Sequence, residues 1–253
     1  MCRYFGVVLL LFWARHELRH PRPLLDVRLL ANRRILLANG SFVMLALGPL
    51  QLPLVLMLLL QQPTWTVVGL GVTATFAGML KLPSNVGSFF FTTWSGYFAT
   101  KHGTRAALIL GAALVLIGQT SVTLWHSSAY IVAACAVVAA LGQTCVFGGV
   151  PNVIVEAAPE DRTSEATGMA QVLRSLSMAI GTQIITMMLA TSTISDAAKG
   201  PGVYPTESSY ILALGFMAAM GLLCLLATIA LPRAHSAVAS RPHSVGIGQP
   251  VAH

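Results

Sequence analysis

Residues 129–155 read AYIVAACAVVAALGQTCVFGGVPNVIV and contain no Asp, Glu, Lys or Arg. About 20 apolar residues are enough to cross the hydrocarbon core of a bilayer as an α-helix. The whole chain has this character, because 55% of its 253 residues are hydrophobic, only 9% are charged and the mean hydropathy is +0.75. A soluble domain carries roughly 25% charged residues. The sequence therefore predicts an all-α integral membrane protein, and it argues against a soluble enzyme, a secreted scaffold or a disordered regulator.

Six segments of membrane-spanning length follow one another along the chain. They are residues 35–60, 66–94, 106–125, 129–155, 166–191 and 209–231. Prolines inside them, such as Pro49, Pro53 and Pro83, are tolerated because neighbouring helices and waters satisfy the freed carbonyls. We therefore expect a six-helix transmembrane domain over residues 35–232. The tail, residues 233–253, is rich in Ser, Pro, Ala and His and is typical of a disordered segment.

The basic residues predict the orientation of these spans. Eleven of the 15 Lys and Arg fall on one side of the membrane: Arg15, Arg19, Arg22, Arg28, Arg33, Arg34, Lys101, Arg105, Arg162, Arg233 and Arg241. Only Arg3 and Lys199 fall on the other side. The positive-inside rule makes the basic side cytoplasmic, so we expect both ends of the domain to lie in the cytoplasm. The membrane would be the plasma membrane of a bacterial cell. Topology also explains the formal charge of +7 better than binding to nucleic acid does.

The first 34 residues do not form a complete span. The apolar run 4–14 is too short to cross the bilayer, and basic residues follow it. Arg3 before an apolar run would suit a signal peptide, but no A-x-A-like cleavage site follows. We therefore expect residues 1–34 to be the end of a preceding membrane helix plus a basic cytoplasmic linker, as in the tail of a longer protein.

Residues 96–105, GYFATKHGTR, combine two glycines with two bases in the connection after the second span. Glycine permits close helix approach and positive φ, and bases interact favourably with helix C-termini. The pattern predicts a tight cytoplasmic turn in which Gly96, Lys101, Gly103 and Arg105 are the candidate gating residues. Any short cytoplasmic connection tends to be glycine-rich and basic, so the pattern alone is not specific.

Residues 96–105 also resemble the signature cytoplasmic loop of the major facilitator superfamily, in the version found in its second half. Three further stretches resemble its fourteen-span drug:proton antiporter branch, in family order: PLLDVRLLANR at residues 23–33, Leu82-Pro83, and Ala166-Thr167-Gly168 followed by Arg174 and Gly181. The chain departs from the family at Thr100, where an acidic residue is usual. It also lacks a match to the preceding half, whose helices carry the coupling carboxylate.

The resemblance implies a fold and a function. The fold would be half of a major facilitator transporter, a six-helix bundle of two inverted three-helix repeats. The function would be proton-driven efflux of drug-like or amphipathic small molecules, with no cofactor besides the proton gradient. The partners would be the lipid bilayer, a small-molecule substrate, and a missing N-terminal half of six to eight helices or a second copy, but no nucleic acid. The alternatives are a half-size transporter acting as a dimer, and a non-transporting remnant or membrane scaffold subunit.

Four polar residues inside the spans are candidates for the substrate cavity: Gln51, Lys81, Gln143 and Arg174. Lys81 costs about 2.5–3.5 kcal/mol to insert. It could meet an anionic substrate or a carboxylate of a missing half. Alternatively, it could lie in water at a helix break at Pro83, or be a neutral lysine packed against carbonyls. Arg174 either faces the cavity or pins the cytoplasmic end of the bundle. The two glutamines could contact a ligand or hydrogen-bond between helices.

The remaining chemical residues suggest no enzyme. All eight acids lie in loops or at span ends, so no proton-coupling carboxylate is visible in a membrane segment. The chain has four cysteines, and no two of them have a paired spacing such as C-x-x-C. We interpret them as free thiols in apolar stretches: Cys2, Cys135, Cys145 and Cys224. No histidine cluster, paired carboxylates or Ser/His/Asp arrangement is present in the spans.

Overall fold

The computed structural model describes residues 32–66, 68–125, 128–159, 162–195 and 202–232. The sequence predictions for residues 1–31 and 233–253 lie outside these ranges. The helices and strands run in this order: α2 (Arg33–Leu47), η2 (Pro49–Gln51), α3 (Leu52–Gln61), η3 (Thr64–Thr66), α4 (Ala74–His102), α5 (Thr104–Leu124), α6 (Ala129–Ala157), α7 (Thr163–Leu189), β1 (Thr193–Ser195), β2 (Val203–Pro205) and α8 (Glu207–Ile229). The prediction of an all-α bundle is confirmed, since β1 and β2 form only a short antiparallel hairpin.

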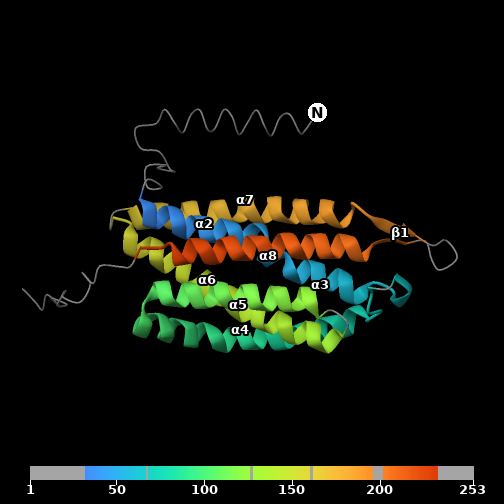
Figure 1. Ribbon diagram of the computed structural model, residues 1–253. Helices are drawn as coiled ribbons and strands as arrows, with labels where there is room; N and C mark the ends of the chain where they lie inside the picture. The colour runs from blue at the N-terminus through green and yellow to red at the C-terminus, as the bar shows by residue number, and fades with distance from the viewer. Residues whose placement is uncertain (1–31, 67, 126–127, 160–161, 196–201, 233–253) are drawn as a thin grey trace, which may run out of the picture.

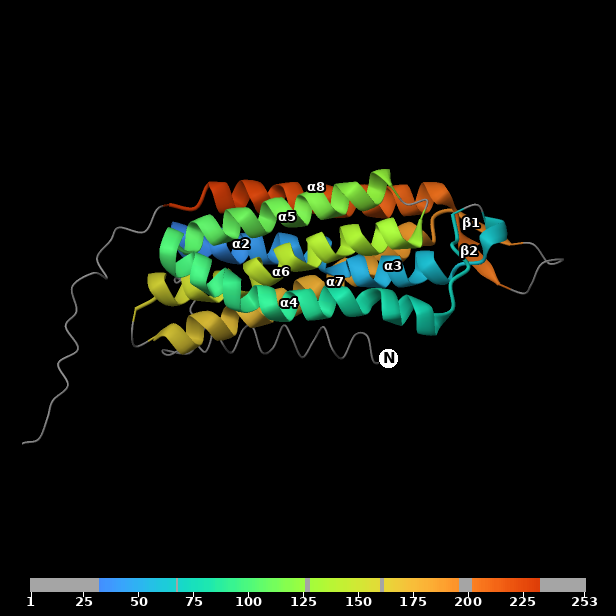
Figure 2. The same cartoon turned by 90° about the horizontal axis from the view of Figure 1, so that it is seen from below.

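The helices lie in three layers, which Figure 2 shows with α5 and α8 on one side, α2, α3 and α6 in the middle, and α4 and α7 on the other side. In Figure 1, α4 and α7 lie at opposite edges of the bundle. The chain turns from α4 into α5 at Gly103, and we call this the Gly103 end. The opposite end, which holds β1 and β2, is called the hairpin end.

The packing has the symmetry of two repeats, one containing α2–α5 and the other α6–α8. In the first repeat α2 contacts α7 and α8, and in the second α6 contacts α4 and α5. Helices in equivalent positions run in opposite directions, because α2 begins at the Gly103 end whereas α6 finishes there. This is the arrangement of two inverted three-helix repeats.

Five predicted spans agree closely with the structure, but the second does not. We expected residues 66–94, whereas α4 runs from Ala74 to His102. Before it, the chain forms η3 and turns at Gly71, whose φ is +62°, and Thr73 then caps α4 by accepting a hydrogen bond from the Phe76 amide. Pro83 does not break the helix.

The tight turn predicted at residues 96–105 is present, but it is much shorter than this segment. Residues 96–102 form the last two turns of α4, and α5 begins at Thr104. Only Gly103 lies between the two helices, with φ of +90° and ψ of +149°. That conformation is essentially restricted to glycine, so a single residue reverses the chain.

Among the residues that the structure describes, five helical segments are long and apolar enough to cross a membrane: Arg33–Gln61, α5, α6, α7 and α8. The sixth, α4, has 29 residues and is long enough, but it is more polar. Its polar residues include Lys81, Ser84, Asn85 and Ser88. A span of this kind is stable in a bilayer when its polar face is turned away from lipid.

The α5–α6 pair packs closely because glycines remove side chains from the contact. A Cβ on Gly142 would lie 2.5 Å from the Gly111 carbonyl oxygen, and one on Gly118 would lie 2.5 Å from the Ala139 nitrogen. Small residues at a contact let helix backbones approach each other within a membrane. These two helices belong to different repeats, so their contact joins the two halves of the bundle.

Candidate functional site

A cavity of about 400 Å³ lies between α3, α4 and α6. This volume is typical of small-molecule sites. Apolar residues of α3 and small residues of α6 form most of its wall, including Leu56, Met57, Ala136 and Ala140. The cavity therefore offers an apolar surface with room for a small molecule.

Polar residues enter this cavity from one face of α4. Lys81, Ser84, Asn85 and Ser88 all line it. Their spacing places them on one side of a helix, because residues three, four and seven apart share a face. The opposite face of α4 carries exposed apolar side chains, such as Phe90 with 68% of its surface exposed. The helix is therefore amphipathic, and its polar face lines the cavity.

Lys81 and Gln143 are the two sequence candidates that line the cavity. Lys81 is exposed in this chain and has no hydrogen bond or ion pair with the residues that the structure describes. Because α4 continues through Pro83, the helix break that would have moved Lys81 into water is not present.

Gln143 also hydrogen-bonds to the backbone where the helix of the first span is interrupted. Pro53 has no N–H group, so it cannot donate to the carbonyl oxygen of Pro49, four residues earlier. This oxygen accepts from the Leu52 amide and, at 2.9 Å, from the Gln143 Nε2 atom. The same side chain therefore stabilises the α2–α3 break and forms part of the cavity wall.

Gln51 is placed differently. Its side chain is buried and does not line the cavity. The Gln51 Nε2 atom donates to the carbonyl oxygens of Ala46 and Met178, at 3.3 and 3.0 Å, and its Oε1 accepts from Thr182 at 2.9 Å. These contacts link the break in the first span to α7, which is a structural role.

Arg174 lies on the far side of a cavity-lining ring. Its guanidinium carbon is 5.1 Å from the ring centroid of Phe147 and 5.8 Å from that of Phe42, and the two rings meet edge to face. Phe147 lines the cavity, whereas Arg174 does not. Cation–π contacts of this kind stabilise the Arg174 guanidinium, whose Nε atom is buried although the residue as a whole is partly exposed.

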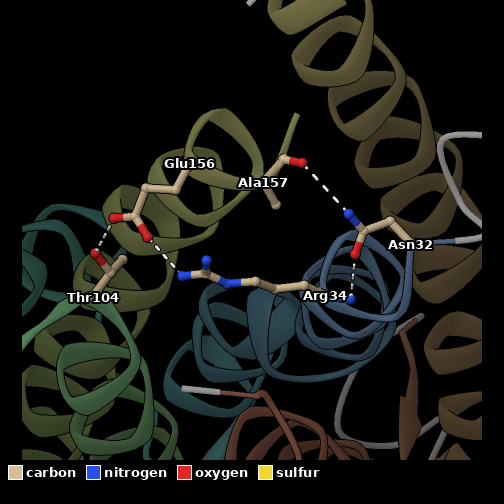
Figure 3. Close-up of polar contacts among 5 residues, drawn as sticks. All are labelled: Asn32, Arg34, Thr104, Glu156 and Ala157. Carbon is tan, nitrogen blue, oxygen red and sulfur yellow. Dashed lines mark hydrogen bonds and ion pairs between the residues drawn. The ribbon is translucent and has the colours of Figure 1, made fainter. Parts of the chain in front are cut away.

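A polar network joins three helices at the Gly103 end, as Figure 3 shows. The Glu156 carboxylate of α6 accepts from the Arg34 guanidinium of α2 at 2.6 Å and from the Thr104 hydroxyl of α5 at 2.7 Å. Asn32 accepts from the Arg34 amide as the N-cap of α2, and its side-chain nitrogen donates to the Ala157 carbonyl oxygen at 3.4 Å. The network is centred on a carboxylate that the resemblance did not single out.

The candidate gating residues lie beside this network. Arg105 donates to the Ile229 carbonyl oxygen at 2.6 Å and so ties the start of α5 to the end of α8. Lys101 is exposed in the last turn of α4, and Gly96 lies within that helix with open space around it. Of the four, Gly103 and Arg105 thus have a direct structural role at the turn.

Sequence reasoning missed much of the cavity wall. Ser84, Asn85 and Ser88 could have been found, because with Lys81 they form a polar stripe at helical spacing. Phe147 carried no such signal, since an aromatic residue in an apolar span is most often core. The structure describes no group of three His, Cys, Asp or Glu side chains that could hold a metal ion.

Comparison with known proteins agrees with this architecture. No curated protein matches the sequence. The model of the Major Facilitator Superfamily matches residues 5–182 and 41–252, two overlapping stretches that together cover nearly the whole chain. With its bundle of paired repeats and its long apolar helices, the chain belongs to the Major Facilitator Superfamily of membrane transporters.

Proposed function

We propose that this chain forms one half of a proton-driven exporter of drug-like or amphipathic small molecules. The observation that supports it best is the cavity between α3, α4 and α6, which combines apolar walls with one polar stripe. An amphipathic molecule needs both kinds of surface. In a transporter of paired halves, such a cavity opens alternately to each side when one half rocks against the other.

In this proposal the Gly103 end faces the cytoplasm of a bacterial cell. The concentration of Lys and Arg on the predicted cytoplasmic side supports this orientation. The second half of the transporter would be a preceding N-terminal domain or a second copy of the chain. The proton-coupling carboxylate would come from that preceding domain, because the described acids Glu156, Glu165 and Glu207 lie at helix ends.

Transport can be tested in everted membrane vesicles that contain the chain together with the preceding domain, with uptake of a fluorescent amphipathic dye as the readout. We expect uptake on energisation and its loss when a protonophore collapses the proton gradient. Ala140→Trp should abolish uptake, because Ala140 lines the cavity. Ala134→Trp is the matched control, since Ala134 is exposed on the same helix and lies outside the cavity wall.

The same experiment separates the alternatives. Uptake by vesicles holding only this chain would favour a half-size transporter that acts as a dimer. Dye binding without uptake, blocked by Ala140→Trp, would favour a chain that needs a further half. Absence of both binding and uptake would contradict the proposal and favour a non-transporting remnant or scaffold subunit.

A further inference from the structure

Two cations and no carboxylate lie in the interior of the helices that the structure describes. Lys81 is in the eighth position of α4, and Arg174 is near the middle of α7. The described acids are all near helix termini: Glu156 in the last turn of α6, Glu165 in the first turn of α7 and Glu207 at the start of α8. Charges inside a membrane domain ordinarily pair with each other or mark the path of an ion or substrate.

Arg174 lacks the partner that such a residue normally has. Its described contacts are the rings of Phe42 and Phe147, and its Nε atom is buried without a hydrogen-bond partner among the described residues. A buried donor without an acceptor is costly, and aromatic rings satisfy it only in part. An unpaired guanidinium of this kind is suited to an anion that arrives from outside the bundle.

The two cations flank the cavity along its length. Gly87 of α4 and Leu141 of α6 lie at the same level of the bundle, because a Cβ on Gly87 would lie 3.5 Å from the Leu141 side chain. Lys81 precedes Gly87 and lies toward the hairpin end. Phe147 follows Leu141 and lies toward the Gly103 end, with Arg174 directly behind its ring. The cavity therefore runs from one positive charge toward another.

We propose that this cavity selects organic anions with an elongated apolar or aromatic body, and that Lys81 binds the anionic group. Lys81 lines the cavity and its ammonium group has no partner among the described residues, and Ser84, Asn85 and Ser88 supply hydrogen-bonding groups along the same face. The apolar body lies against Leu56, Met57 and the Phe147 ring.

Electrostatics favours this class over cations. Walls of low polarity concentrate the field of the charges they contain, so two cations around a cavity attract anions and repel cationic compounds. Arg174 contributes to this field across the Phe147 ring without touching the ligand. Arg174 makes the electrostatic potential of the cavity more positive, whereas Lys81 contacts the anionic group of the ligand.

This inference rests on the proposed function, because it assigns a substrate class to the same cavity. The test uses equilibrium binding, which does not require transport. The full-length chain in lipid nanodiscs is titrated with naphthalene-2-sulfonate, neutral 2-naphthalenemethanol and the cation (naphthalen-2-ylmethyl)trimethylammonium. The three probes share one aromatic body and differ in charge.

We expect the native chain to bind the sulfonate most tightly. Lys81→Gln should weaken sulfonate binding by about 10- to 100-fold, which is the range for losing a hydrogen bond to a charged group. Binding of the neutral alcohol should change by about twofold or less, which also shows that the variant is folded. Lys81→Arg should restore most of the sulfonate affinity, and Arg174→Gln should lower it several-fold.

Arg33→Gln is the charge-matched control, because Arg33 is exposed at the first position of α2 and far from the cavity wall. It should leave all three affinities unchanged. Equal sulfonate affinity in the native chain and Lys81→Gln would overturn the inference, as would a preference of the native chain for the cationic probe. Sulfonate binding without export, even when the preceding domain is present, would contradict the proposed function alone, and export of the cation unaffected by Lys81→Gln would contradict only the choice of anions.

Discussion

The Arg34 guanidinium and the Glu156 carboxylate meet at 2.6 Å and join the first turn of α2 to the last turn of α6. The two helices open the two repeats and run in opposite directions. Their ion pair therefore fixes one repeat against the other at the Gly103 end. The second carboxylate oxygen of Glu156 accepts from Thr104, so the start of α5 is held at the same point.

Glu156→Ala should loosen the Gly103 end without unfolding the bundle. The Glu156 side chain is 36% exposed and the Arg34 side chain 18%, so solvent screens the pair and its loss costs about 1 kcal/mol or less. Hydrogen exchange should accelerate in the first turns of α2 and α5 and stay unchanged at the hairpin end. Glu156→Gln retains one acceptor oxygen and should have a smaller effect. Identical exchange in all three proteins would show that the network holds nothing in place.

Gly142→Ala should destabilise the contact between α5 and α6. Its Cβ would lie 2.5 Å from both the Gly111 carbonyl oxygen and the Val115 nitrogen, and overpacking of this kind costs about 1–3 kcal/mol. Gly148→Ala on the same helix is the control, because open space surrounds that position. It should stabilise α6 by up to about 1 kcal/mol through helix propensity. Unfolding in mixed micelles of rising SDS content would measure both, and equal stabilities would refute the close packing.

Gly103→Ala should strain the turn between α4 and α5. Alanine in the φ of +90° that Gly103 adopts costs about 1–3 kcal/mol. We expect a lower melting temperature and faster proteolysis at the turn. Gly96→Ala lies inside α4 with no neighbour within 4 Å and should raise the melting temperature slightly. A Gly103→Ala variant as stable as the parent would mean that the turn adopts another conformation.

Gln143→Leu and Gln51→Leu should differ in their effect on binding. Both lose hydrogen bonds between helices, which in membranes are worth about 0.6 kcal/mol each on average. Both should therefore lower the free energy of unfolding modestly. Because only Gln143 lines the cavity, Gln143→Leu should also change the affinity for a bound dye, and by more than Gln51→Leu does. Larger binding changes in Gln51→Leu would contradict the placement of the two amides.

The spans were predictable from sequence because apolar length is a strong signal in membrane proteins. The start of α4 was not, since residues 66–73 are as apolar as a span but are interrupted by the turn at Gly71. The end of α4 was also missed. Two glycines and two bases suggested a loop, although helical residues continue to His102 and one glycine suffices for the reversal.

The candidate site was predictable only in part. A charge inside a span is rare, so Lys81 was found, and the structure places it on the cavity wall. The roles of Gln51 and Gln143 depend on which backbone carbonyls lie within reach of their side chains. This follows from the three-dimensional course of the first span. The orientation in the membrane and the efflux activity stay predictions.

The break between α2 and α3 has a mechanical consequence. Around Pro49, the backbone changes from α to 3-10 hydrogen bonds, and the side-chain amides of Gln51 and Gln143 add further contacts. Breaks of this kind bend a helix. The α3 segment, which lines the cavity, is thus less stiffly joined to α2 than two parts of one continuous helix would be. The α3 part of the cavity wall can therefore shift to fit ligands of different shapes. The Gly103 end keeps its geometry meanwhile, because the Arg34–Glu156 ion pair holds it.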